Sequence, residues 1–204
     1  MEKEDEEGDI KVILLGESGM GKTSLINAAL GLDFEENMAS TISSSFVTKD
    51  YIKNNKIYRL NIWDTAGQET YRALTKLFIK NSKIVLFVYS INNKLSFEGL
   101  QTYWVSMAKE ILVNEAVYAL VGSKSDLYNE EQVKDSEGME YAEKIGAKFT
   151  LASAKTNKEG FISFLEELLD EFLSKNKGGV TKDKSFEIKK EKHKKKKNKN
   201  KCCQ

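Results

Sequence analysis

The chain has 204 residues, of which 40% are hydrophobic, so it is long enough for one domain with an apolar core and a tail. Its formal net charge of +1 conceals opposite ends, because residues 1–9 carry −5 and residues 182–201 carry +8. This composition excludes a disulfide-stabilised core, since the two cysteines are adjacent near the C-terminus, and it offers no apolar run near the roughly 18 residues that a membrane span needs.

Apolar patterning along the chain predicts strands that alternate with helices. The expected strands are residues 10–15, 44–52, 56–63, 84–91, 116–122 and 148–152, and the expected helices are 23–30, 95–114, 130–145 and a last one spanning 161–172. Such alternation predicts an α/β fold, with a mostly parallel six-stranded sheet and helices on both faces. We expect an acidic N-terminal extension at 1–8, one domain at 9–176 and a flexible tail at 177–204.

A glycine-rich turn follows the first expected strand and opens the first expected helix. The segment from Gly16 to Thr23 reads G-E-S-G-M-G-K-T and matches the phosphate-binding pattern G-x-x-x-x-G-K-[ST]. Gly16, Gly19 and Gly21 let the backbone wrap closely around a phosphate, and the helix N-terminus adds a positive dipole. Lys22 supplies a charge for the β and γ phosphates, and the Thr23 hydroxyl is a hard oxygen suited to Mg²⁺. The motif predicts a nucleoside triphosphate site, the alternative being a chance glycine turn.

Two polar segments at the ends of later strands indicate the base. The segment S-K-S-D ends at Asp126, whose carboxylate can accept hydrogen bonds from the N1–H and amino group of guanine, a donor pair that adenine lacks. The segment S-A-K at 153–155 follows the last expected strand, and a backbone N–H there can reach the guanine O6. Each segment alone is more often a plain loop, but their order and placement predict guanine.

A heptad at another strand end indicates the reaction. Residues 63–69 read W-D-T-A-G-Q-E. Asp64 can hold magnesium through a water, Gly67 can donate its N–H to a γ phosphate, and Gln68 can orient an attacking water. The alternatives are a cap or turn role for Asp64 and a solvated loop for Gln68.

With these four motifs in order, the chain resembles the Ras superfamily of small GTPases, and within it the Rab family, over essentially its whole length. The resemblance implies a P-loop small GTPase fold that binds GTP or GDP with Mg²⁺, hydrolyses GTP slowly and switches effectors in vesicular membrane traffic. It also implies that Phe34 stacks on guanine, that Thr41 binds magnesium and the γ phosphate, and that residues 65–80 form the second switch. Further Rab-like features are Ser18 and the Tyr71-Arg72 pair that comes after the heptad.

The resemblance assigns roles residue by residue. Gln68 is the expected catalytic residue, and the expected magnesium ligands are Thr23, Thr41 and Asp64. The expected effector surface consists of Phe46, Trp63 and Phe78. The expected nucleotide-binding residues are Gly16, Ser18, Gly19, Met20, Gly21, Lys22, Thr23, Ser24, Phe34, Thr41, Gly67, Ser123, Lys124, Asp126, Leu127, Ser153, Ala154 and Lys155.

The chain departs from the family pattern at Ser123, where the family usually has an Asn that tethers the base loop to the phosphate loop. Serine is shorter and offers fewer hydrogen bonds, so we expect weaker nucleotide affinity and faster exchange, by roughly 5- to 150-fold. A second departure, the serine run 43–45, lies in a segment that contacts partners in the family.

The C-terminal segment predicts a lipid anchor. A lysine-rich run at 182–201 precedes Cys202-Cys203-Gln204, which lacks a C-a-a-X box and ends like doubly prenylated Rabs. Two lipid chains give stable membrane anchoring, and basic residues add attraction to anionic lipid. We therefore expect lipidation at Cys202 and Cys203, and a place on the cytoplasmic face of an intracellular membrane with a cytosolic pool. A nuclear-import or nucleic-acid patch is the alternative, but the run has no interleaved aromatics, so we expect no nucleic acid.

The expected partners are an exchange factor, a GTPase-activating protein, effectors, and proteins of the prenylation-escort and GDP-dissociation-inhibitor type. Two other function classes share part of the pattern. An ATP-using P-loop kinase or ATPase gives no role to Asp126 or to residues 153–155. A non-hydrolysing GTP-binding scaffold gives no role to Gln68, Thr41 and Gly67.

Overall fold

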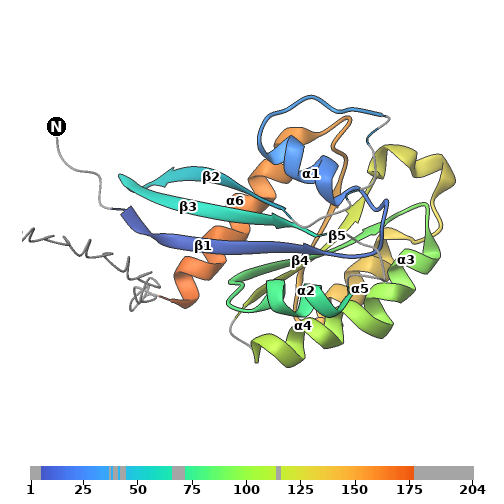
Figure 1. The fold of residues 1–204 in the computed structure, drawn as a ribbon. Coiled ribbons are helices and arrows are strands. Elements are labelled where there is room, and N and C mark those ends of the chain that lie inside the picture. The colour runs from blue at the N-terminus through green and yellow to red at the C-terminus, as the bar shows by residue number, and fades with distance from the viewer. Residues whose placement is uncertain are drawn as a thin grey trace, which may run out of the picture.

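The computed structural model describes residues 6–36, 38, 41, 45–65, 72–113 and 116–176. Its centre is a six-stranded sheet in the order β2-β3-β1-β4-β5-β6 (Figure 1). The β2–β3 pair is antiparallel, and every other neighbouring pair is parallel. The strands are β1 (Glu6–Leu15), β2 (Ser45–Lys53), β3 (Lys56–Asp64), β4 (Ile84–Ser90), β5 (Val117–Ser123) and β6 (Lys148–Ala152).

Helices cover both faces of this sheet, which confirms the predicted fold class. They are α1 (Lys22–Ala29), α2 (Arg72–Ile79), α3 (Lys94–Gly99), the π-helix η2 (Leu100–Trp104), α4 (Val105–Leu112), the 3₁₀ helix η3 (Ser125–Glu130), α5 (Asp135–Ile145) and α6 (Lys158–Lys175). In Figure 1, α1 and α6 lie on one side of the sheet, and α2 to α5 lie on the other. Among the described residues, no helix is both long and apolar enough to cross a membrane.

Alternation along the buried strands explains the two layers. In β1, Val12 and Leu14 pack with α1 and α6, whereas Ile13 and Leu15 pack with α3 and α4 on the other face. Successive side chains of a strand point to opposite faces, so a strand that is apolar throughout must be covered on both. β4 obeys the same rule, since all seven of its residues are buried.

The structure adds α2 and η3 to the predicted helices, and the largest other departures from the predicted elements are three. β1 begins at Glu6 rather than residue 10, because it pairs with β3 from Glu6 onward. The helix expected at 130–145 begins only at Asp135, because the chain before it is held elsewhere: the N–H groups of Gln132 and Val133 both donate to the Ile91 carbonyl. The helix expected at 95–114 is instead three segments, with the π-helix η2 between α3 and α4.

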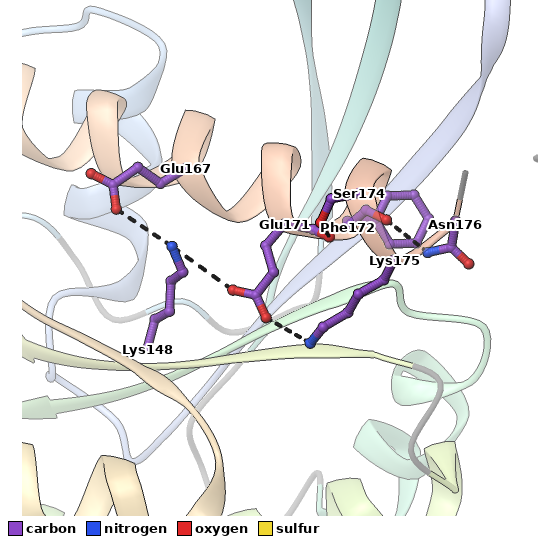
Figure 2. A network of polar contacts seen from close by, with 7 residues as sticks. All are labelled: Lys148, Glu167, Glu171, Phe172, Ser174, Lys175 and Asn176. Carbon is purple, nitrogen blue, oxygen red and sulfur yellow. Dashed lines mark hydrogen bonds and ion pairs between the residues drawn. The ribbon is translucent and has the colours of Figure 1, made fainter.

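Charged side chains join α6 to the start of β6 (Figure 2). Lys148 Nζ lies 3.7 Å from a Glu167 carboxylate oxygen and 3.8 Å from one of Glu171, and Lys175 Nζ lies 2.6 Å from the other Glu171 oxygen. The helix ends where the Asn176 side chain donates to the Phe172 carbonyl at 2.8 Å. These surface ion pairs each contribute about 0–1 kcal/mol to stability. Lys148 is the first residue of β6, so the network lies away from the loop that follows Ala152.

Candidate functional site

The loops at the carboxyl ends of the parallel strands surround one cavity of about 320 Å³. The loop after β1 lines one part of it, and the segments after β5 and β6 line another. Ligands of open α/β sheets bind at this end of the strands. The phosphate loop and the two predicted base-binding segments therefore converge on one place.

The phosphate loop holds Lys22 in a buried position. Lys22 is 5% exposed, and its Nζ donates to the backbone carbonyls of Gly16 at 2.9 Å and Glu17 at 2.8 Å. Burial lowers the pKa of Lys22 to about 8, against the carboxylates of Asp64 and Glu17, which raise it. Lys22 is the first residue of α1, and Gly21 before it has a φ of 83°. The arrangement places a cation beside the N-terminus of a helix, as phosphate sites require.

The lowered pKa of Lys22 predicts proton uptake when an anionic nucleotide binds. The folded pKa of about 8 lies below the ordinary 10.5, so around pH 9 the amine is mostly neutral in the folded chain and charged in the unfolded one. This group's contribution to the free energy of unfolding therefore rises as the pH increases from about 8 to 10.5. A phosphate beside Nζ favours the charged form, so GDP binding at about pH 9 takes up a proton. Calorimetry in buffers of different ionisation enthalpy measures this uptake.

At about pH 6.5 Lys22 is charged before and after binding, so the same titration gives the control without uptake by this residue. A binding enthalpy at pH 9 that does not depend on the buffer would contradict the prediction.

Three oxygens meet beside Lys22. The Thr23 hydroxyl donates to Asp64 Oδ2 at 2.6 Å and lies 2.7 Å from the Thr41 hydroxyl, which is itself 3.4 Å from the same carboxylate oxygen. Asp64 is 5% exposed, and its Oδ1 has no hydrogen-bond partner among the described residues. Burial raises the Asp64 pKa, while the Thr23 hydrogen bond, Lys22 and the Thr41 hydrogen bond lower it. One buried carboxylate with an unpartnered oxygen, next to two hydroxyls, fits Mg²⁺ that also binds substrate phosphates.

The other end of the cavity carries the predicted base-binding groups. The Ser153 hydroxyl donates to Asp126 Oδ1 at 2.6 Å and accepts from the backbone N–H groups of Lys155 at 3.2 Å and Thr156 at 3.1 Å. These contacts hold the two base-binding segments together although they lie 27 residues apart. Asp126 is thereby oriented as an acceptor at the rim of the cavity.

Ion pairs cross from the base-binding segments to the chain around Phe34. Lys158 Nζ lies 2.9 Å from the Asp33 carboxylate, and Lys155 Nζ lies 3.4 Å from that of Glu36. Lys155 Nζ is also 5.8 Å from the centre of the Phe34 ring, which is 37% exposed. The hydrogen bond from Lys158 lowers the Asp33 pKa. The phenyl ring therefore lies at the mouth of the cavity, on the same side as Asp126.

Ser123 tethers the base loop to the phosphate loop. Its hydroxyl lies 2.6 Å from the Met20 carbonyl in the phosphate loop and 2.8 Å from the Tyr89 carbonyl, and the residue is 1% exposed. A hydroxyl carries one proton and donates fully to only one of the two carbonyls at a time. Weaker affinity than in chains with Asn here therefore stays a prediction.

Ser123→Ala and Ser123→Asn test this tether in opposite directions. Alanine leaves two buried carbonyls without this donor, and we expect GDP release about 5- to 150-fold faster than in wild type. An Asn amide carries two donor hydrogens, so we expect slower release than in wild type. Release of a fluorescent GDP analogue measures both rates, and an Asn variant that releases no more slowly than wild type would refute the expectation.

The structure places most of the predicted nucleotide-binding residues around the cavity. Those that line it are Ser18, Gly19, Met20, Gly21, Lys22, Thr23, Ser24, Phe34, Thr41, Ser123, Lys124, Asp126, Leu127, Ala154 and Lys155. Gly16 and Ser153 act behind the lining, through a Lys22 contact and an Asp126 contact. Gly67, Gln68, Cys202 and Cys203 lie outside the described residues.

Sequence reasoning missed five lining residues. These are Leu25, Glu35, Glu36, Met38 and Thr65. Thr65 is the next residue after Asp64 in the heptad, and its hydroxyl donates to the Leu14 carbonyl at 2.6 Å, which ties the end of β3 to β1. Position within the motif was a signal for Thr65, whereas nothing in the sequence marks Glu36 as the partner of Lys155.

The three aromatic residues predicted as an effector surface form one cluster. The rings of Phe46 and Trp63 stack with centroids 5.2 Å apart, and Phe78 lies 5.4 Å from Trp63. Phe46 is 55% exposed, and Lys11 Nζ lies 4.6 Å from the Trp63 ring centre. The cluster joins β2, β3 and α2 on one surface, and its role in partner binding stays a prediction.

Comparison with known proteins places these motifs in a family. Residues 11–173 match the family model described as "Ras family". The chain is 37% identical over 163 residues to Ras-related protein Rab-21 of Homo sapiens, which covers 78% of this chain and 72% of that protein. It is 39% identical over 162 residues to Rab-17 of Mus musculus, covering 78% and 75%, and 35% identical over 177 residues to Rab-31 of Rattus norvegicus, covering 84% and 90%.

Proposed function

The chain belongs to the Rab family of Ras-like small GTPases, and from that premise we propose that it is a membrane-anchored switch that hydrolyses GTP slowly. GTP-bound and GDP-bound states alternate, and the GTP state recruits effectors in vesicular membrane traffic. An exchange factor reloads the site, and a GTPase-activating protein speeds hydrolysis. Proteins of the prenylation-escort and GDP-dissociation-inhibitor type handle the lipidated chain.

One observation carries this proposal: Lys22 with the Thr23–Thr41–Asp64 oxygens and Asp126 with Ser153 serve a single cavity. The first group suits phosphates with Mg²⁺, and the second suits the donor edge of guanine. An ATP-using P-loop enzyme explains the first group only. The distribution of groups therefore favours a guanine nucleoside triphosphate.

The proposed reaction is in-line attack of water on the γ phosphate, in which a new P–O bond forms and the bond to the leaving GDP breaks. Lys22 and the backbone N–H groups of the phosphate loop stabilise the negative charge that moves toward the β–γ bridge. Thr23, Thr41 and Asp64 would hold Mg²⁺, which neutralises phosphate charge when bound. Gln68 orients the water.

We expect slow intrinsic GTP hydrolysis because the motifs place no arginine of the chain at the phosphates. The sequence holds two, Arg59 and Arg72. Arg59 pairs with Asp50 at 3.0 Å on the β2–β3 hairpin, and Arg72 begins α2 in the segment expected to switch. An arginine that stabilises transferring phosphate charge is worth about 10³–10⁵ in rate, so a partner that supplies one accounts for activation.

The switch and the anchor complete the proposal. The γ phosphate would hold Thr41 and Gly67, and its loss would release both loops for partners to sense. In the GTP-bound state, effectors would contact the aromatic cluster of Phe46, Trp63 and Phe78 together with these loops. Prenyl groups on Cys202 and Cys203, beside the lysine-rich run, would hold the chain on the cytoplasmic face of an intracellular membrane, with a cytosolic pool.

A melting experiment tests the nucleotide. GDP with Mg²⁺ is expected to raise the melting temperature of the purified chain, because a ligand of the native state stabilises it by mass action, and ADP is expected to leave it unchanged. Equal protection by ADP would exclude the guanine site and favour an ATP-using enzyme.

Gln68→Leu tests the hydrolysis. The leucine side chain cannot orient the attacking water, so we expect single-turnover phosphate release at least 10-fold slower than in wild type, with GTP binding retained. Equal rates in wild type and variant would contradict the role given to Gln68. A wild type that binds GTP without releasing phosphate would instead identify a non-hydrolysing scaffold.

A further inference from the structure

One side chain of the phosphate loop, at a position that the motif leaves variable, is hydrogen-bonded to a helix far along the chain. Glu17, the first variable residue of the motif, accepts a hydrogen bond at its Oε1 from the indole N–H of Trp104, at 2.9 Å and 87 residues away. Trp104 is fully buried and ends the π-helix η2. The contact therefore links the nucleotide site to the run of helix formed by α3, η2 and α4.

The helix has two features that suit this contact. A Cβ built on Gly99 would lie 3.1 Å from Glu17 Oε1 and 3.4 Å from its Cγ, so the absence of a side chain at Gly99 leaves room for the carboxylate. The π-helix begins at the next residue, Leu100. One π-turn adds a residue to the helical repeat and rotates the side chains beyond it, and such turns are frequent at functional sites. Gly99 thus leaves space for the Glu17 carboxylate, and the π-turn that begins at Leu100 orients the donor, Trp104.

The same residue also holds the phosphate-binding lysine. The Glu17 backbone carbonyl accepts from Lys22 Nζ at 2.8 Å, and the Gly16 carbonyl beside it accepts at 2.9 Å. Moving Glu17 moves the oxygens that orient this lysine. The side chain bonded to Trp104 and the backbone bonded to Lys22 belong to one residue, so the two contacts are mechanically coupled.

We propose that Glu17 and Trp104 form a positioning pair, through which the α3–η2–α4 helix holds the first turn of the phosphate loop in the geometry that retains a nucleotide. This inference rests on the proposed function, since it concerns the residence of GDP in that site. Neither side chain is a catalytic residue; both act through the loop and Lys22. A partner that moved this helix would change nucleotide release without touching the nucleotide.

The test measures GDP release and the indole N–H resonance in the full chain. Glu17→Ala and Trp104→Phe each remove the hydrogen bond, and we expect each to speed GDP release about three- to tenfold. The double variant is expected to release GDP more slowly than the two single effects added together predict, because both changes break the same Glu17–Trp104 hydrogen bond. Glu17→Gln keeps an acceptor oxygen, so it is expected to release more slowly than Glu17→Ala. Glu171→Gln, in the α6 network of Figure 2, is the matched surface control with unchanged release.

The two tryptophans give two indole resonances, and Trp63→Phe identifies the one that belongs to Trp104. We expect Glu17→Ala to shift the Trp104 resonance and Glu17→Gln to shift it less. Additive acceleration in the double variant, or equal release from Glu17→Gln and Glu17→Ala, would overturn the pairing. If Trp104→Phe does not fold, the two Glu17 variants and the resonance still decide. Wild type that retains GDP while both Glu17 variants release it at the wild-type rate overturns the positioning pair alone, whereas wild type that retains no GDP overturns the proposed function and the inference with it.

Discussion

Asp126→Ala is expected to remove most of the preference for guanine over adenine nucleotides. The carboxylate is the acceptor for two donors on the guanine edge, and a hydrogen bond to a charged group is worth about 1.5–3 kcal/mol. Loss of both corresponds to roughly 10²- to 10⁴-fold weaker GDP binding. Phosphate contacts through Lys22 are unchanged, so the residual affinity should distinguish GDP from ADP far less than in wild type, through the backbone N–H expected at the guanine O6. Competition between the two nucleotides for a fluorescent analogue measures the preference.

Ser153→Ala is the matched control, because it removes the hydroxyl that donates to Asp126 at 2.6 Å while leaving the carboxylate in place. We expect a smaller loss of GDP affinity, with the preference for guanine retained. An Asp126→Ala chain that prefers GDP to ADP as strongly as wild type would show that Asp126 does not recognise the base. A Ser153→Ala chain as weak as Asp126→Ala would show that orientation of the carboxylate matters as much as its presence.

Local pattern was sufficient to predict the sheet and the phosphate loop. β4 and β5 are apolar runs because both of their faces are covered, and this property is visible in seven consecutive residues. The phosphate loop is visible because its glycines and Lys22 lie within one short segment. The meeting of Asp126 with Ser153 was also predictable, because the carboxyl ends of parallel neighbours β5 and β6 lie side by side.

The features that sequence reasoning missed depend on partners far along the chain. The break of the 95–114 helix at η2 accompanies a bond between Trp104 and Glu17, 87 residues away. The tether made by Ser123 depends on the Met20 carbonyl at a separation of 103 residues, and a backbone carbonyl carries no mark in a sequence. The early start of β1 depends on how far β3 extends beside it. The periodicity of apolar residues reflects contacts within one helix or strand, so it cannot reveal these contacts between distant parts of the chain.

Gly16→Ala is expected to destabilise the fold far more than an ordinary glycine substitution. A Cβ at Gly16 would lie 2.1 Å from the Val88 carbonyl oxygen, and the residue has a φ of 153°. Val88 lies in β4 between β1 and β5, so its carbonyl cannot retreat without breaking the centre of the sheet. Backbone strain and overpacking each cost about 1–3 kcal/mol, together about 2–6 kcal/mol of the roughly 5–15 kcal/mol typical for a domain.

Gly146→Ala separates the steric clash from the effect of left-handed backbone alone. Gly146 has a φ of 65° and nothing within 4 Å of a built Cβ, so its substitution carries only the conformational cost of about 1–2 kcal/mol. Denaturant unfolding of both variants with saturating GDP measures the difference in the free energy of unfolding. Equal losses in the two variants would mean that the phosphate loop can move away from β4. In that case the loop would be held by its ligand rather than by the sheet, and the carbonyls that orient Lys22 would not be set before the nucleotide arrives.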